Sequence, residues 1–177
     1  LLIQIKEDIE RENIAQHSIT SLFIGGGTPS TYAAHHYEVI LDLIFPYLIK
    51  DAEITIEANP NSATKEWLKG VFSLGINRIS FGTQSFDDAK LKLLGRAHCA
   101  KEAINAIDNA SHVGFEHISF DFIYGTKYDT NAFITQELSL INTLPIDHVS
   151  SYNLIIEEGT PFAKNPNFRI EREENYH

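Results

Sequence analysis

The order of apolar and polar positions predicts strands that alternate with helices along the chain. Short apolar runs typical of buried strands begin near residues 21, 53, 78, 117 and 148. Between them, apolar residues recur at helical spacing and predict amphipathic helices at 1–12, 31–49, 62–74, 100–113 and 130–144. Such alternation predicts a parallel sheet with right-handed crossover connections.

Local signals refine these helices and the fold class. Pro46 is expected to kink or shorten the helix at 31–49, and Ser62 is a candidate N-cap for the next one. The helix at 130–144 carries Ile134, Leu138 and Ile141 on one face. Because a helix opens the chain with no strand before it, a first strand is expected to be missing. The pattern predicts most of a βα barrel, closed or half open, with a doubly wound open sheet as the alternative.

Composition narrows the class of protein. The 177 residues carry a net charge of −10, which argues against binding of nucleic acid or an anionic membrane, because both need clustered Lys and Arg. No apolar run is long enough for a transmembrane segment. The single cysteine, Cys99, excludes a disulfide within the chain and fits a reducing, cytoplasmic setting. A start at Leu1 and the absence of Met suggest the middle of a longer protein.

Polar residues gather where the predicted strands end, which is the edge that holds the ligand in either architecture. Backbone N–H groups of glycines can bind a carboxylate or phosphate of a ligand. Acidic side chains can accept hydrogen bonds from an ammonium or from ribose hydroxyls. Together they indicate a ligand with both signs of charge and a sugar. The residues concerned are Gly25, Gly26, Gly27, Thr28, Glu57, Asn59, Gln84, Ser85, Arg96, Asp121, Tyr152, Asn153 and Glu157.

Each of these residues also has an ordinary structural reading. The glycines could simply make a tight turn, and they match neither a phosphate-binding P-loop nor G-x-G-x-x-G. Glu57 and Gln84 could face solvent, and Arg96 alone reads as a surface charge. Asp121 is different, because it lies between Phe120 and Phe122, where an unpaired carboxylate is costly. No residue is a convincing nucleophile or general base, which favours chemistry supplied by a cofactor.

Five strings in fixed order carry a family resemblance: GGGTPS, IEANP, INRISFGTQSFDDAKLKLLGRAH, FDFIYG and SSYNLIIEEGTPF. They resemble the radical S-adenosylmethionine (SAM) family of oxygen-independent coproporphyrinogen III oxidase and the HemW-type haem chaperone. The resemblance runs from about Leu1 to Phe162 and implies a partial (βα)6 barrel that presents SAM to a [4Fe-4S] cluster. Residues 1–165 would form this barrel core, and residues 166–177 would begin a linker or C-terminal region.

The resemblance also implies a set of cofactor-binding residues. In that family the glycine motif meets the methionyl end of SAM through backbone groups. Carried over, the set is Gly26, Gly27, Thr28, Glu57, Gln84, Arg96, Asp121 and Ile155. The family's C-x-x-x-C-x-x-C cluster motif is absent, and Cys99 alone cannot hold a cluster. The cluster cysteines are therefore expected upstream of Leu1.

The sequence leaves three alternatives for the function: two branches of this family and one class of protein outside it. The strings GTQSF and SSYNLIIEEGTPF are more similar to the HemW branch, whose members bind and deliver haem. The oxidase alternative would use a 5′-deoxyadenosyl radical to convert two propionates to vinyl groups, as a radical SAM oxidoreductase. An unrelated βα-barrel protein is the third alternative. The resemblance implies a porphyrin or haem ligand and an electron-donor protein as partners.

Overall fold

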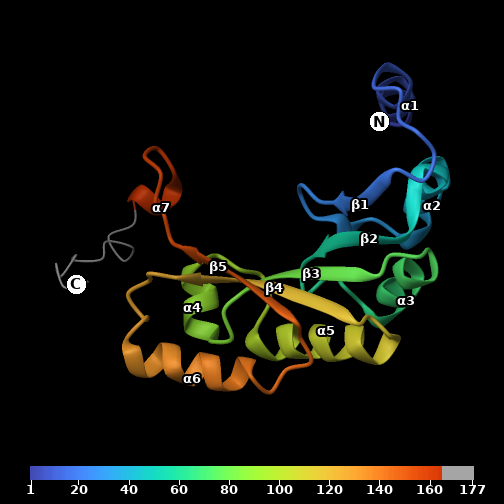
Figure 1. Cartoon of the computed structure of the whole chain (residues 1–177). Coiled ribbons are helices and arrows are strands. Elements are labelled where there is room, and N and C mark those ends of the chain that lie inside the picture. The colour runs from blue at the N-terminus through green and yellow to red at the C-terminus, as the bar shows by residue number, and fades with distance from the viewer. Residues whose placement is uncertain (165–177) are drawn as a thin grey trace.

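Five parallel strands form one curled sheet in the computed structural model, which describes residues 1–164 (Figure 1). The strands follow chain order across the sheet, β1-β2-β3-β4-β5. This order has no reversal point, so the doubly wound alternative is wrong and the half-open barrel is confirmed. The strands are β1 (Ile19–Ile24), β2 (Leu48–Ala58), β3 (Arg78–Gln84), β4 (His117–Tyr124) and β5 (His148–Asn153).

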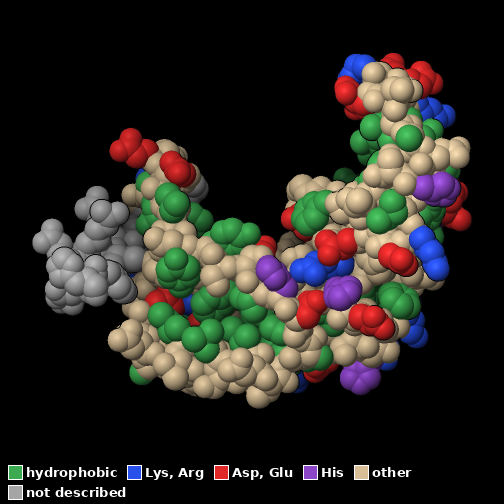
Figure 2. Space-filling model, viewed as in Figure 1, with side chains coloured by type: hydrophobic (Ala, Val, Ile, Leu, Met, Phe, Trp, Pro, Cys, Tyr) green, Lys and Arg blue, Asp and Glu red, His purple; other side chains and the backbone are tan. Residues whose placement is uncertain are grey.

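Helices connect the strands and cover one face of the sheet. Helices α3, α5 and α6 lie along its outer, convex side, and the molecule is hollowed on the other side (Figures 1 and 2). The helices are α1 (Leu2–Arg11), α2 (Glu38–Ile44), α3 (Lys65–Ser73), α4 (Asp88–Leu93), α5 (Ala100–Val113), α6 (Asn131–Ile141) and α7 (Pro161–Lys164). Short 3₁₀ helices occur at Pro29–Thr31, Ala34–Tyr37 and Phe45–Tyr47.

The hydrophobic core lies between the sheet and these outer helices. Side chains alternate across a strand, so one residue faces the helices and the next faces the hollow. Ile56, Phe81 and Phe120 are fully buried on the helix side. Their chain neighbours Glu57, Gly82 and Asp121 belong to the opposite, concave face. The fold thus gives the sheet an apolar outer face and a polar inner face at the carboxyl ends.

The segment predicted as a helix at 31–49 departs from expectation. Only Glu38–Ile44 is α-helical, and Pro46 lies in a 3₁₀ turn directly before β2. The hydroxyl of buried Tyr37 donates to the carbonyl of Pro29 at 2.7 Å, which holds the preceding residues in tight turns. Strand β2 also begins earlier than predicted, because Leu48 pairs with Ile19.

The N-cap of α3 was also predicted at the wrong residue. Thr64 caps the helix, with its hydroxyl accepting from the backbone N–H of Trp67 at 3.1 Å. The Ser62 hydroxyl is instead 2.6 Å from that of Ser30, so it serves the loop after β1. The linker or C-terminal region predicted at 166–177 lies outside the described residues. Among residues 1–164, no helix is long and apolar enough to cross a membrane.

Candidate functional site at the carboxyl ends of the strands

The three glycines after β1 serve two separate physical needs. A Cβ at Gly25 would lie 2.5 Å from Phe23 Cε1 and 2.9 Å from Glu57 Oε2, so a side chain there would displace the ends of both neighbouring side chains. Gly26 and Gly27 have φ of +82° and +65°, in the left-handed region that favours glycine. A Cβ at either would meet nothing within 4 Å. Their backbone therefore borders open space that a ligand can approach closely.

The ends of β1 and β2 are joined through polar contacts. The N–H of Gly26 donates to Glu57 Oε2 at 3.1 Å, so Glu57 orients the glycine turn. Asn59 Nδ2 lies 3.4 Å from the Thr28 hydroxyl, a long contact on the same edge. The structure thus brings together Gly26, Thr28 and Glu57, which the sequence nominated separately.

Three polar side chains meet over Gly82, the glycine within β3. A Cβ there would lie 3.1 Å from Asn59 Oδ1, 3.4 Å from Arg96 Nη2 and 3.5 Å from Gln84 Nε2. Arg96 Nη2 also donates weakly to the Gly82 carbonyl at 3.4 Å. Gln84 and Arg96 therefore converge over the inner face of the sheet.

Asp121 faces the same region from β4. Burial raises the pKa of its carboxyl, and the neighbouring Glu57 raises it further, while Arg96 and His148 oppose the shift. Burial lowers the pKa of the Arg96 guanidinium, and Asp121 counteracts this. Glu57 and Arg96 are thus both close enough to Asp121 to shift the pKa of its carboxyl. This arrangement suits a ligand that brings an ammonium and a carboxylate to one site.

Ile155 stands apart from the other predicted residues. It is 74% exposed, in the segment that follows β5. The segment begins at Leu154, whose N–H donates to the Tyr124 carbonyl at 2.7 Å. A contact from Ile155 to a ligand stays a prediction.

Sequence reasoning missed several contributors to this site. Gly82 was not singled out, although glycine inside a strand often marks a close approach. His98 was not singled out either, yet it is buried with Nε2 3.0 Å from the Thr83 carbonyl. Among residues 1–164, no group of three metal-ligating side chains is assembled. A cavity of about 450 Å³ near His17, Leu48 and Asn77 lies at the opposite, amino edge of the sheet.

A curled parallel sheet with a polar carboxyl edge defines a partial α/β barrel, the architecture in which that edge is the usual place for a ligand. The family model described as "Radical SAM superfamily" matches residues 2–135. The chain belongs to the radical SAM superfamily.

Its similarity to known proteins agrees with this membership. The chain is 39% identical over 170 residues to a protein named heme chaperone HemW from Haemophilus influenzae, across 94% of this chain and 44% of that protein. It is 38% identical over 144 residues to the mouse protein "Radical S-adenosyl methionine domain-containing protein 1, mitochondrial", across 80% and 33% of the two chains. The solved structure of coproporphyrinogen III oxidase (HemN) from Escherichia coli superposes with a TM-score of 0.69 at 27% identity, covering 77% of this chain and 32% of that one. The chain therefore spans less than half the length of these relatives.

Proposed function

We propose that this chain forms the SAM-binding part of a radical SAM protein. The observation that carries the proposal is the open backbone at Gly26 and Gly27, beside groups of both charges. SAM has an ammonium, a carboxylate and ribose hydroxyls, so the residues present fit it chemically. They do not provide ligands for a cluster within residues 1–164.

Different residues of this chain would contact different parts of the cofactor. Gly26, Gly27 and Thr28 let the methionyl end approach the backbone. Glu57 and Asp121 offer acceptors, and Arg96 offers donors with a positive charge. When bound, SAM and a reduced [4Fe-4S] cluster supply a 5′-deoxyadenosyl radical. The cluster cysteines would belong to a segment upstream of Leu1, a proposal supported by how little of each relative this chain spans.

The remaining cofactor contacts come from the later strands. Gln84 and Arg96 converge above Gly82, where they exclude water from one side of a bound ligand. Ile155 would add an apolar contact from the segment after β5. In this proposal no side chain acts as nucleophile or general base, and the protein contributes binding and positioning.

For the whole protein we propose a HemW-like haem-binding chaperone, cytoplasmic, with haem or a porphyrin as ligand and an electron-donor protein as partner. The name shared by several relatives supports this branch. A coproporphyrinogen III oxidase is the second candidate, favoured by the 27% identity to the solved oxidase. It would make this protein a radical SAM oxidoreductase of porphyrin biosynthesis.

The deciding experiment uses the full-length parent protein, reconstituted anaerobically with iron and sulfide. After addition of reductant, SAM and coproporphyrinogen III, 5′-deoxyadenosine and porphyrinogen products are quantified. A parallel titration with haem follows the absorption band of bound haem. We expect deoxyadenosine, no decarboxylated porphyrinogen and a haem-bound spectrum.

Two other results would overturn parts of the proposal. Deoxyadenosine together with protoporphyrinogen would make the protein the oxidase. Failure to assemble a cluster or to bind SAM would remove the radical SAM function itself. A parallel preparation carrying Asp121→Ala serves as the binding control, because that variant should assemble a cluster normally but bind SAM weakly.

A further inference from the structure

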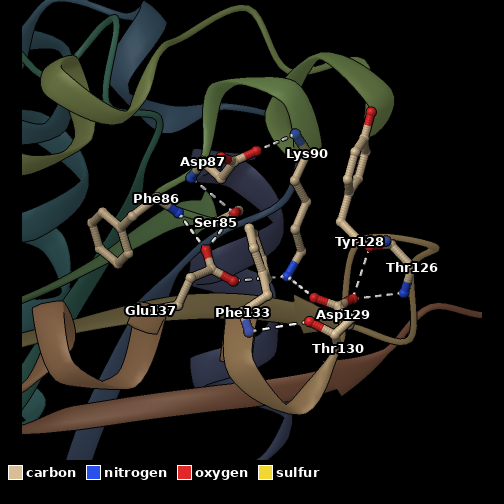
Figure 3. A network of polar contacts seen from close by, with 10 residues as sticks. All are labelled: Ser85, Phe86, Asp87, Lys90, Thr126, Tyr128, Asp129, Thr130, Phe133 and Glu137. Carbon is tan, nitrogen blue, oxygen red and sulfur yellow. Dashed lines mark hydrogen bonds and ion pairs between the residues drawn. The ribbon is translucent and has the colours of Figure 1, made fainter. Parts of the chain in front are cut away.

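A buried ionic network centred on Lys90 connects α4, α6 and the loop after β4 (Figure 3). Lys90 on α4 is 0% exposed, and its Nζ contacts Asp129 Oδ1 at 2.7 Å and Glu137 Oε2 at 3.0 Å. The same ammonium lies 4.5 Å from the centre of the Phe122 ring. The two carboxyl groups come from the loop that follows β4 and from α6, 39 and 47 positions along the chain from Lys90.

The network is unusual because it buries more negative than positive charge. One lysine faces two carboxylates whose side chains are 3% and 5% exposed. Burying ions is costly unless each is paired and hydrogen-bonded, and replacement by apolar residues is often neutral or stabilising. A buried network of this kind is therefore not explained by stability alone.

Glu137 links this network to the residue that follows β3. Its Oε1 accepts from the Ser85 hydroxyl at 2.5 Å and from the backbone N–H of Phe86 at 2.8 Å. Ser85 and Phe86 directly follow Gln84, which is buried and has a φ of +70°. A non-glycine residue in the left-handed region costs free energy and persists where its surroundings hold it. On the other side of Gln84, the Thr83 carbonyl contacts His98 Nε2 at 3.0 Å.

The network also reaches the segment that carries Arg96. The Ser85 hydroxyl accepts from the N–H of Asp87, and Asp87 caps α4 by accepting from the N–H of Lys90 at 2.8 Å. Arg96 follows α4 within a turn, with its N–H donating to the Leu91 carbonyl. The contacts of Ser85 thus extend as far as the cap of α4, and Arg96 lies one turn beyond that helix.

We propose that Glu137, held in place by Lys90, is a positioning residue that fixes Gln84 in its left-handed backbone conformation for SAM binding. The proposal rests on the function proposed above. Glu137 itself contacts no ligand, because it is buried on the opposite side of β3 from the hollow. Its carboxylate acts through the hydrogen bonds to Ser85 and Phe86.

The test measures SAM affinity of the full-length parent by equilibrium dialysis, together with amide hydrogen exchange over residues 83–87. For Glu137→Ala we expect about tenfold weaker SAM binding, the order of one hydrogen bond to a charged group, and faster exchange at 83–87. Ser85→Ala is the milder variant if Glu137→Ala fails to fold, and it should shift both readouts in the same direction. Asn77→Ala is the control at a distance from the site, because it removes two part-buried hydrogen bonds at the amino edge of the sheet, one to the Ala52 carbonyl and one from the Ile54 N–H.

A double variant separates positioning from general stability. In a Gln84→Ala background, Glu137→Ala should cause no additional loss of affinity, since its effect passes through Gln84. An unchanged affinity in Glu137→Ala, an undiminished effect in the double variant, or an equal loss in Asn77→Ala would each overturn the proposal. If the unmodified protein does not bind SAM, the proposed function fails, and hydrogen exchange alone still decides whether Glu137 holds the Gln84 segment.

Discussion

The open space at Gly26 can be tested by adding a single methyl group. Gly26→Ala places a Cβ where no protein atom lies within 4 Å, at a backbone φ of +82°. The left-handed conformation costs an L-residue about 1–2 kcal/mol, so the variant is expected to unfold at a lower urea concentration. If SAM occupies this space, the methyl group also forces the ligand to move.

Gly26→Ala should weaken SAM binding by a factor that a titration can resolve. Overpacking a well-filled contact by one methyl costs about 1–3 kcal/mol, which corresponds to roughly fivefold to 150-fold weaker binding. The assay is a SAM titration of the full-length parent by calorimetry or dialysis. The free energy of unfolding is measured on the same samples by urea denaturation.

Gly159 provides a closely matched control. Its φ is +84°, and a Cβ there would likewise meet nothing within 4 Å. Gly159→Ala should therefore carry a similar backbone cost while leaving SAM affinity unchanged. Normal binding by Gly26→Ala would show that the glycines only shape a turn, and equal loss in both variants would show that the effect is not local to the site.

Other consequences follow from the charges of the described residues. Asp121→Asn should stabilise the fold at neutral pH by about 1 kcal/mol, because burial and then Glu57 raise the pKa of Asp121 and make its ionised form costly. In urea denaturation at several pH values, this gain should shrink as pH falls through that raised pKa and the carboxyl takes up a proton. Burial lowers the pKa of His98 in the folded protein from its ordinary value of 6.5. The stability of the fold should therefore decline as pH falls below 6.5, because the unfolded chain then takes up a proton more readily than the folded one. Thermal melts of His98→Gln at several pH values should lack this decline. Lys90→Met should lose about 3 kcal/mol or more of unfolding free energy because it leaves buried carboxylates without a cation, whereas Lys92→Met, on the exposed side of the same helix, should change it by less than about 0.5 kcal/mol.

Much of the architecture can be read from the sequence because it depends on local periodicity. The five strands follow from the apolar patterns: four begin within two residues of their predicted starts, and β2 begins five residues before its predicted start. The glycine turn after β1 and the acidic residues at the later strand ends were likewise visible as strand-end chemistry. Their roles toward SAM stay predictions, although the structure brings most of them to one edge.

Tertiary structure alone decided which polar residues are buried and which backbone is strained. On α6 the apolar face was predicted to include Leu138, yet Leu138 is 48% exposed and Glu137 is buried. Periodicity ranks a carboxylate as a surface residue, and it cannot anticipate that Lys90 from another helix will neutralise it. A weak signal existed, because Lys90 lies four residues from both Phe86 and Leu94 on an apolar stripe. The left-handed conformation of Gln84 had no sequence signal, and the hydrogen bonds to the two residues after it come from Glu137, more than 50 positions away along the chain.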